Sequence, residues 1–193
     1  MISSSRPERK VNPARPIRIN LEKLGIGDIR FWKEKVRQDD SLFAEIYQLI
    51  FCDNPQLAWH AAWVLDHLSE EEPEKLEPYI SELIDHLPNL KSSSLKRHFT
   101  RMLSRYKIPE GRVGMLIDVL YNLLSPAEAI AVRVFSLQTL FQIVLKEPEL
   151  QNELISVIES ILESENSPAI NSKGRHILRA LNPMVQQRSK QQN

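Results

Sequence analysis

Residues 57–68 read LAWHAAWVLDHL, and the apolar spacing of this stretch recurs three more times along the chain. Leu57, Ala61, Val64 and Leu68 stand at i, i+4, i+7 and i+11, the spacing that places side chains on one face of an α-helix. Equivalent sets follow at offsets of 38, 35 and 40 positions. They are Leu95, Phe99, Met102 and Tyr106, then Ile130, Val134, Leu137 and Phe141, and then Ile170, Gly174, Ile177 and Leu181.

A second series of helices lies between the first and shares its period. Its apolar positions are Ile80, Leu83 and Leu87, then Ile117, Leu120 and Leu124, then Ile155, Ile158 and Leu162. Two interleaved series with one period of about 38 residues predict a stack of helical hairpins. We therefore expect an all-α fold, a right-handed α-α superhelix of about four hairpins with a C-terminal capping helix.

The prolines divide this pattern into helices. Asn54–Pro55, Ser125–Pro126 and Ser167–Pro168 each place a capping side chain before a proline suited to the first turn, and Pro183 is predicted to end the last helix. Helices are predicted over residues 28–38, 41–52, 55–68, 76–87, 93–106, 111–124, 127–145, 149–164 and 168–181.

Several of these stretches resemble a known family. WHAAWVLDHL (59–68), followed by EPEKLEPYISELIDHL (72–87), resembles a HEAT repeat, including the proline near the start of its second helix. Together with LKRHFTRML (95–103), AVRVFSLQTL (131–140) and KGRHILRAL (173–181), they look like short, free-standing bacterial HEAT-like proteins. The resemblance covers residues 54–181 and implies an armadillo-like α-solenoid, a form that suits a protein-binding scaffold.

Composition sets the broad class. The 193 residues are 42% hydrophobic and 26% charged, as in soluble globular proteins. The single cysteine, Cys52, cannot form an internal disulfide, and no apolar run approaches the roughly 20 residues that span a bilayer. We expect a cytoplasmic protein with no membrane association. It is divided into a basic, Pro/Arg-rich mobile tail (1–24), one repeat domain (25–182) and a polar C-terminal tail (183–193).

Charge alternates in sign along the chain, although the total is zero. Residues 1–38, 91–115 and 171–193 carry +6, +6 and +5, whereas residues 39–90 and 116–170 carry −11 and −6. Local fields of this size act on partners even when the net charge vanishes.

One position in the first series of helices is basic in every repeat. The residue just before the second apolar position is His60, His98, Arg133 and Lys173 in turn, a set called here the ladder. Further cations accompany it, and Arg97, Arg101 and Arg175 are the predicted partner contacts among them. One interpretation is an anion-binding stripe. The other is that the long basic side chains cover apolar surface beside the core.

Trp59 and Trp63 lie one turn apart, and two roles are open for them. They could form an aromatic rim that contacts a peptide or a base, or wedge between neighbouring repeats. The five histidines show no metal-ligand spacing, and Cys52 has no base near it in sequence. We therefore predict no catalytic residue, no metal site and no cofactor.

Three classes of function can be compared with these sequence features. The favoured one is a non-enzymatic adaptor for a protein or peptide partner. The alternative is nucleic-acid binding, because HEAT-like alkylpurine DNA glycosylases use this architecture, but the acidic second helices argue against it. An enzyme has no residue-level support.

The N-terminal helices raise a separate question about partners. They are rich in apolar residues, so either residues 17–26 or a second copy of the chain, as a homodimer, is expected to cover them. The residues concerned are Phe31, Trp32, Phe43, Ile46, Leu49 and Ile50.

Overall fold

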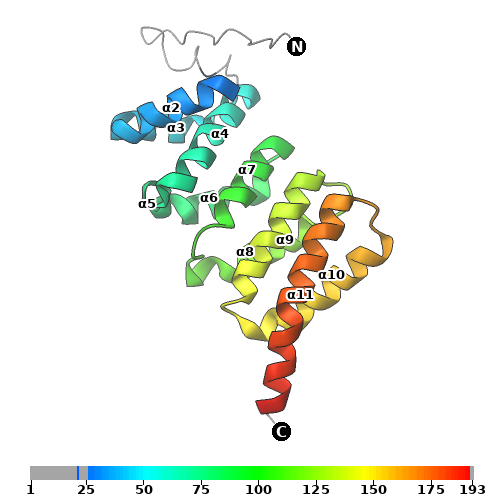
Figure 1. Ribbon diagram of the computed structural model, residues 1–193. Coiled ribbons are helices and arrows are strands. Elements are labelled where there is room, and N and C mark those ends of the chain that lie inside the picture. Colours follow the sequence, from blue (N-terminus) through cyan, green and yellow to red (C-terminus); the bar gives the residue numbers. More distant parts are fainter. Residues whose placement is uncertain (1–20, 22–25, 192–193) are drawn as a thin grey trace, which may run out of the picture. The chain divides into compact units, whose positions relative to one another are not determined.

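The computed structural model describes the backbone of residue 21 and of residues 26–191, and the side chains of residues 21 and 28–182 (Figure 1). The described residues fall into two compact units, divided between Pro78 and Tyr79. Both units are built from helices, and no strand occurs among the described residues. The all-α prediction is therefore confirmed. The predicted tail over 1–24 lies outside the described residues except for Leu21, whose side chain is fully buried.

The first unit is organised around its longest helix. Its helices are α2 (Ile26–Gln38), α3 (Asp40–Leu49), α4 (Pro55–Glu71) and α5 (Pro73–Leu76). Helix α4 packs against both α2 and α3, and its stripe Leu57, Ala61, Val64 and Leu68 is buried. The Asn54 side chain accepts hydrogen bonds from the backbone amides of Gln56 and Leu57, as predicted for an N-cap before proline.

Most of the apolar residues of the N-terminal helices are buried in the single chain. Trp32, Phe43, Ile46, Leu49 and Ile50 are buried, and Phe31 is half-buried.

The second unit repeats one packing arrangement. Its helices are α6 (Ile80–His86), α7 (Ser93–Leu103), α8 (Val113–Asn122), α9 (Ile130–Val144), α10 (Gln151–Ser164) and α11 (Pro168–Gln191). Short 3₁₀ turns precede or follow several of them, at Glu77–Tyr79, Leu87–Asn89, Glu110–Arg112 and Pro148–Leu150. The first-series helices pack in sequence, α7 on α9 and α9 on α11, while α8 packs on α9, and α10 packs on both α9 and α11 (Figure 1). This is the hairpin stacking that the two interleaved series predicted.

Helix boundaries differ from the prediction at three prolines. Ser125–Pro126 forms a turn, with the amide of Ala127 bonded to Ser125 Oγ, so α9 begins at Ile130 and not at residue 127. Because Ile130 opens the helix, its side chain is 50% exposed and does not join the core stripe. The segment predicted as one helix over 76–87 is interrupted by a 3₁₀ turn that contains Pro78. Helix α11 continues past Pro183 to Gln191, so the prediction that this proline ends the helix was wrong; a proline removes one backbone donor, and here the turns continue beyond it.

Gly174 fixes how closely α11 approaches α10. A Cβ atom at this position would lie 3.0 Å from Ile158 Cγ2 and 3.2 Å from Leu162 Cδ2. Ile158 is itself buried, so it has little room to move aside. Glycine is therefore used where the equivalent stripe positions hold Ala61, Phe99 and Val134.

We expect Gly174→Val to lower the free energy of unfolding by about 1–3 kcal/mol, because two methyl groups are forced against a packed neighbour. The matched control is Gly114→Ala in α8, where a Cβ atom has no heavy atom within 4 Å. That change should be neutral or stabilise by up to about 1 kcal/mol through helix propensity. Chemical denaturation followed by circular dichroism measures both variants, and a Gly174→Val protein as stable as the parent would refute the close-packing argument.

Candidate functional site

The ladder residues differ sharply in exposure. His60, His98 and Arg133 are only 3%, 1% and 6% exposed, and Lys173 is half-buried. His60 belongs to the first unit and the other three to the second. Three of the four ladder residues, which were predicted to form a cationic stripe, are therefore buried. Each of the four contacts another residue of its own unit.

His60 joins α4 to the chain N-terminal to α2. Its Nδ1 lies 2.5 Å from the backbone carbonyl oxygen of Leu21, and a carbonyl can only accept, so Nδ1 carries the proton. The ring also lies against Trp59, with centroids 4.6 Å apart. His60 thus helps to hold the buried Leu21 in place.

His98 is bonded to its sequence neighbour. The Arg97 guanidinium donates to His98 Nε2 over 3.1 Å, and a guanidinium has no acceptor atom. His98 Nε2 is therefore an acceptor, which assigns the ring proton to Nδ1 in the neutral imidazole.

Arg133 connects three segments of the second unit. Its Nε donates to the carbonyl oxygen of Leu124 over 3.0 Å, and its Nη1 lies 2.6 Å from Glu165 Oε2. Glu165 Oε1 in turn accepts from the backbone amide of Ser167, just before α11. The Ser167 amide, followed by the Arg133 guanidinium, lowers the pKa of Glu165 below its ordinary value. The guanidinium therefore ties α9 to the turn that follows α8 and to the start of α11.

Lys96 and Glu128 repeat this arrangement one repeat earlier. Lys96 Nζ pairs with the Glu128 carboxylate, which lies just before α9. Both pairs join a cation of one first-series helix to a glutamate that precedes the next, and both span 32 positions of sequence. The sequence prediction missed the two glutamates, although this shared separation was a usable signal.

The remaining basic residues divide into paired and exposed ones. Lys173 Nζ donates to Gln138 Oε1 over 2.7 Å, and the Arg101 guanidinium lies over the Phe135 ring at 5.9 Å from its centroid. Both contacts join neighbouring first-series helices. Arg175 is exposed on α11. Of the three predicted partner contacts Lys173, Arg101 and Arg175, Arg175 is therefore the most accessible to a partner.

The tryptophans form a parallel pair on α4. The Trp59 and Trp63 rings are inclined by 3° with centroids 6.0 Å apart, and both are half-buried. Trp63 also lines a shallow pocket of about 240 Å³ in the first unit, together with Ile29, Arg30, Lys33 and His67. Part of each ring is therefore available at the surface of this unit.

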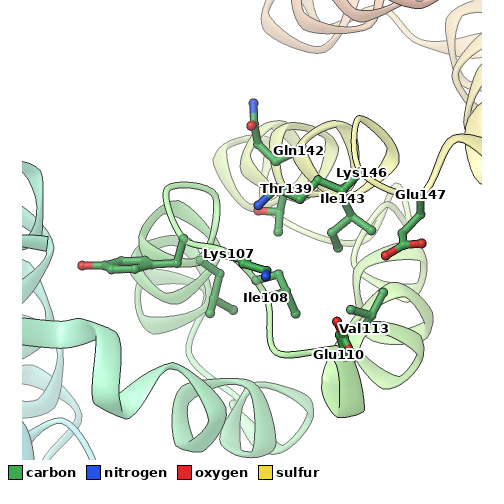
Figure 2. A pocket seen from close by; sticks show the side chains of 11 residues that line it. Lys107, Ile108, Glu110, Val113, Thr139, Gln142, Ile143, Lys146 and Glu147 are labelled. Atoms are coloured by element: carbon green, nitrogen blue, oxygen red, sulfur yellow. The ribbon is translucent and has the colours of Figure 1, made fainter. Parts of the chain in front are cut away.

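A pocket with an apolar floor lies in the second unit, where the ends of α7 and α9 meet the start of α8 (Figure 2). Its volume is about 240 Å³. Figure 2 shows Ile108, Val113 and Ile143 turned toward one another, and Leu103 also contributes to the wall. The lining includes Lys107 and Lys146, Glu110 and Glu147, and the neutral polar residues Thr139 and Gln142. The pocket thus combines apolar surface with equal numbers of acidic and basic side chains.

The described residues contain neither a metal-binding cluster nor a membrane-spanning helix. No group of three or more His, Cys, Asp or Glu side chains that could hold a metal ion occurs in the part of the chain with described side chains. Among the described helices, none has the length and apolar character needed to cross a membrane. Cys52 is half-buried, with its sulfur 3.6 Å from the carbonyl oxygen of Asn54.

Repeated helical hairpins, with first-series helices packed on one another, define a helical-repeat protein. A family model described as a HEAT repeat domain matches residues 20–181, and the chain belongs to this family. No curated protein and no solved structure matches the chain. HEAT repeat domains are generally non-enzymatic modules of the protein-interaction scaffold kind.

Acid should weaken the contact between Arg133 and Glu165. Because the pKa of Glu165 is lower folded than unfolded, its stabilising contribution is complete above the unfolded value of about 4.3 and is lost as pH falls through the folded value. We expect Glu165→Gln to be less stable than the parent at pH 7. Between pH 5 and pH 3 (about one pH unit either side of that value), we expect it to lose less stability than the parent loses. Denaturation midpoints across this range test it.

The control for this titration is Glu163→Gln, which removes an exposed carboxylate on α10. It should leave the pH dependence close to that of the parent. Equal pH dependence in the parent and in Glu165→Gln would show that the contact contributes nothing to acid lability.

Proposed function

We propose that the chain is a non-enzymatic scaffold or adaptor that binds a protein or peptide partner, and that the pocket of the second unit is one of its contact points. The observation that supports this most directly is the composition of the pocket. Its floor is apolar, and its lining carries two lysines and two glutamates. Peptides present apolar side chains beside charges of both signs, which suits such a lining.

The size of the pocket favours a side chain over a free small molecule. Pockets for drug-sized ligands and cofactors typically measure about 300–1,000 Å³. At about 240 Å³ this pocket falls below that range. A single large apolar side chain of a partner, inserted between Val113 and Ile143, is the occupant that this volume suits.

Nucleic-acid binding is less well supported. A phosphate backbone requires a surface with an excess of positive charge. Arg133 is buried and paired with Glu165, Lys96 with Glu128, and the pocket lining is balanced in charge. The exposed or half-buried cations Arg97, Arg101, Lys173 and Arg175 remain predicted partner contacts, and a partner with carboxylates would suit them.

Affinity capture from a lysate of the native host, with and without nuclease, tests the proposal. The parent should retain specific proteins after nuclease treatment. Lys146→Glu, which makes the pocket lining acidic, should reduce their recovery at least about fivefold, the effect of losing roughly 1 kcal/mol of binding energy. Lys91→Glu makes the same charge change at an exposed site outside the pocket and should have no effect.

Two outcomes would contradict the adaptor function or its contact point. Recovery that disappears with nuclease would replace the adaptor with a nucleic-acid-binding protein. Equal loss of recovery in Lys146→Glu and Lys91→Glu would exclude the pocket as the contact point. A third variant, Arg175→Ala, reports separately on the exposed cation of α11.

A further inference from the structure

A second surface of the second unit lies between the helices α8 and α10. Tyr121 and Leu124 line it from the α8 side, and Glu153, Ser156, Val157, Ser160 and Ile161 line it from α10. The groove has a volume of about 500 Å³, twice that of the pocket at the ends of α7 and α9. Val157 and Ile161 are half-buried, so apolar surface remains accessible along the groove. No residue is shared between the two sites.

The two helices that flank this groove carry charges of one sign. Helices α8 and α10 carry four carboxylates, and neither helix contains a lysine, arginine or histidine. The four are Asp118, Glu153, Glu159 and Glu163, all of them exposed. This contrasts with the first-series helices α7, α9 and α11, each of which holds at least one arginine.

Three of these carboxylates stand beside the groove. Glu153 lines it directly. Asp118 is three residues before Tyr121 and Glu163 three after Ser160, so each is the helix-face neighbour of a lining residue. The neighbourhood affects Tyr121, since burial, and then the negative charge of Glu153 and its hydrogen bond, raise the pKa of Tyr121 to about 12.

We propose that the α8–α10 groove binds a basic amphipathic segment of a partner protein, in which apolar residues are interleaved with lysine or arginine. The apolar side chains would occupy the groove along Leu124, Val157 and Ile161, and the cations would pair with the flanking carboxylates. Such a segment matches the groove in both polarity and charge, whereas a nucleic acid or an anionic lipid surface would be repelled. This inference rests on the proposed function, since it names the chemistry of one partner segment.

The volume of the groove suits several side chains on one face of a peptide segment. Its volume exceeds that of a single side chain and it opens to solvent between two helices, as in recognition of amphipathic helices by apolar grooves. The carboxylates around it should also speed association with a cationic segment, and this effect should weaken with salt because exposed charges are screened.

The experiment is a titration of the full chain into a fluorescent synthetic peptide of leucine and lysine at amphipathic helical spacing, followed by anisotropy. A peptide with glutamate in place of each lysine serves as the probe control. The groove variant is Glu153→Gln/Glu163→Gln, and Val157→Ser tests the apolar contribution. The charge-matched control is Glu45→Gln/Glu74→Gln, which removes two exposed carboxylates of the first unit.

We expect the lysine peptide to bind and the glutamate peptide not to bind. The groove variant should weaken binding at least about tenfold and Val157→Ser at least about threefold, whereas the charge-matched control should stay within about twofold of the parent. Circular dichroism melting curves establish that each variant is folded, and only folded variants are compared.

Failure of this inference can be told apart from failure of the proposed function. Absence of peptide binding, or equal weakening by the groove variant and the charge-matched control, would overturn the groove assignment. If capture of nuclease-resistant partners persisted in that case, the adaptor function would stand and only the groove would be excluded. Loss of all capture with nuclease would overturn both, because the groove is assigned to a protein partner.

Discussion

Helix α9 is packed between α7 and α11 and also contacts both second-series helices that flank it, α8 and α10. It is therefore buried over most of its circumference, and its interior positions include polar residues as well as apolar ones. A helix in this position can carry a charged side chain only if that charge is paired, because an unpaired buried charge is strongly destabilising. Arg133 meets this requirement through the Leu124 carbonyl and the Glu165 carboxylate.

The same requirement links one repeat to the next. Arg133 reaches a glutamate before α11, Lys96 reaches one before α9, and Thr139 Oγ1 donates to the Thr100 carbonyl oxygen of α7 over 3.1 Å. Each of these contacts joins consecutive first-series helices or the loops that lead into them. Burial of apolar side chains holds the stacked helices together. The polar contacts fix the register in which neighbouring helices pack.

Two cations of the second unit, Arg133 and Lys96, are therefore paired with glutamates inside the stack, and the second-series helices α8 and α10 set the character of one surface. Helices α8 and α10 hold carboxylates without cations, and the groove between them is partly apolar. The pocket at the ends of α7 and α9 differs from it in having a balanced lining. The two surfaces thus differ in charge, and the proposed scaffold function assigns them to different parts of a polypeptide partner.

The apolar period was sufficient to predict the all-α repeat fold, because each helix must bury one face and the spacing of that face is local information. The surroundings of the ladder could not be obtained in this way. Whether Arg133 contacts solvent or Glu165 depends on a residue 32 positions away that only the folded repeat brings close. The start of α9 was misplaced because Ser125–Pro126 suits a turn as well as a helix N-terminus. Pro183 predicted a helix end because proline usually interrupts an α-helix, but α11 continues to Gln191.

Cations of the first-series helices join neighbouring repeats, and the contact between Arg133 and Glu165 is the one most open to measurement. A double-mutant cycle on Arg133→Met and Glu165→Gln measures its coupling energy, from the free energy of unfolding at pH 7 of the parent, both single variants and the double variant. We expect strong coupling, in which the double variant loses clearly less stability than the sum of the two single losses. Additive losses would show that Arg133 and Glu165 act independently, and would contradict the claim that their contact holds the repeats together.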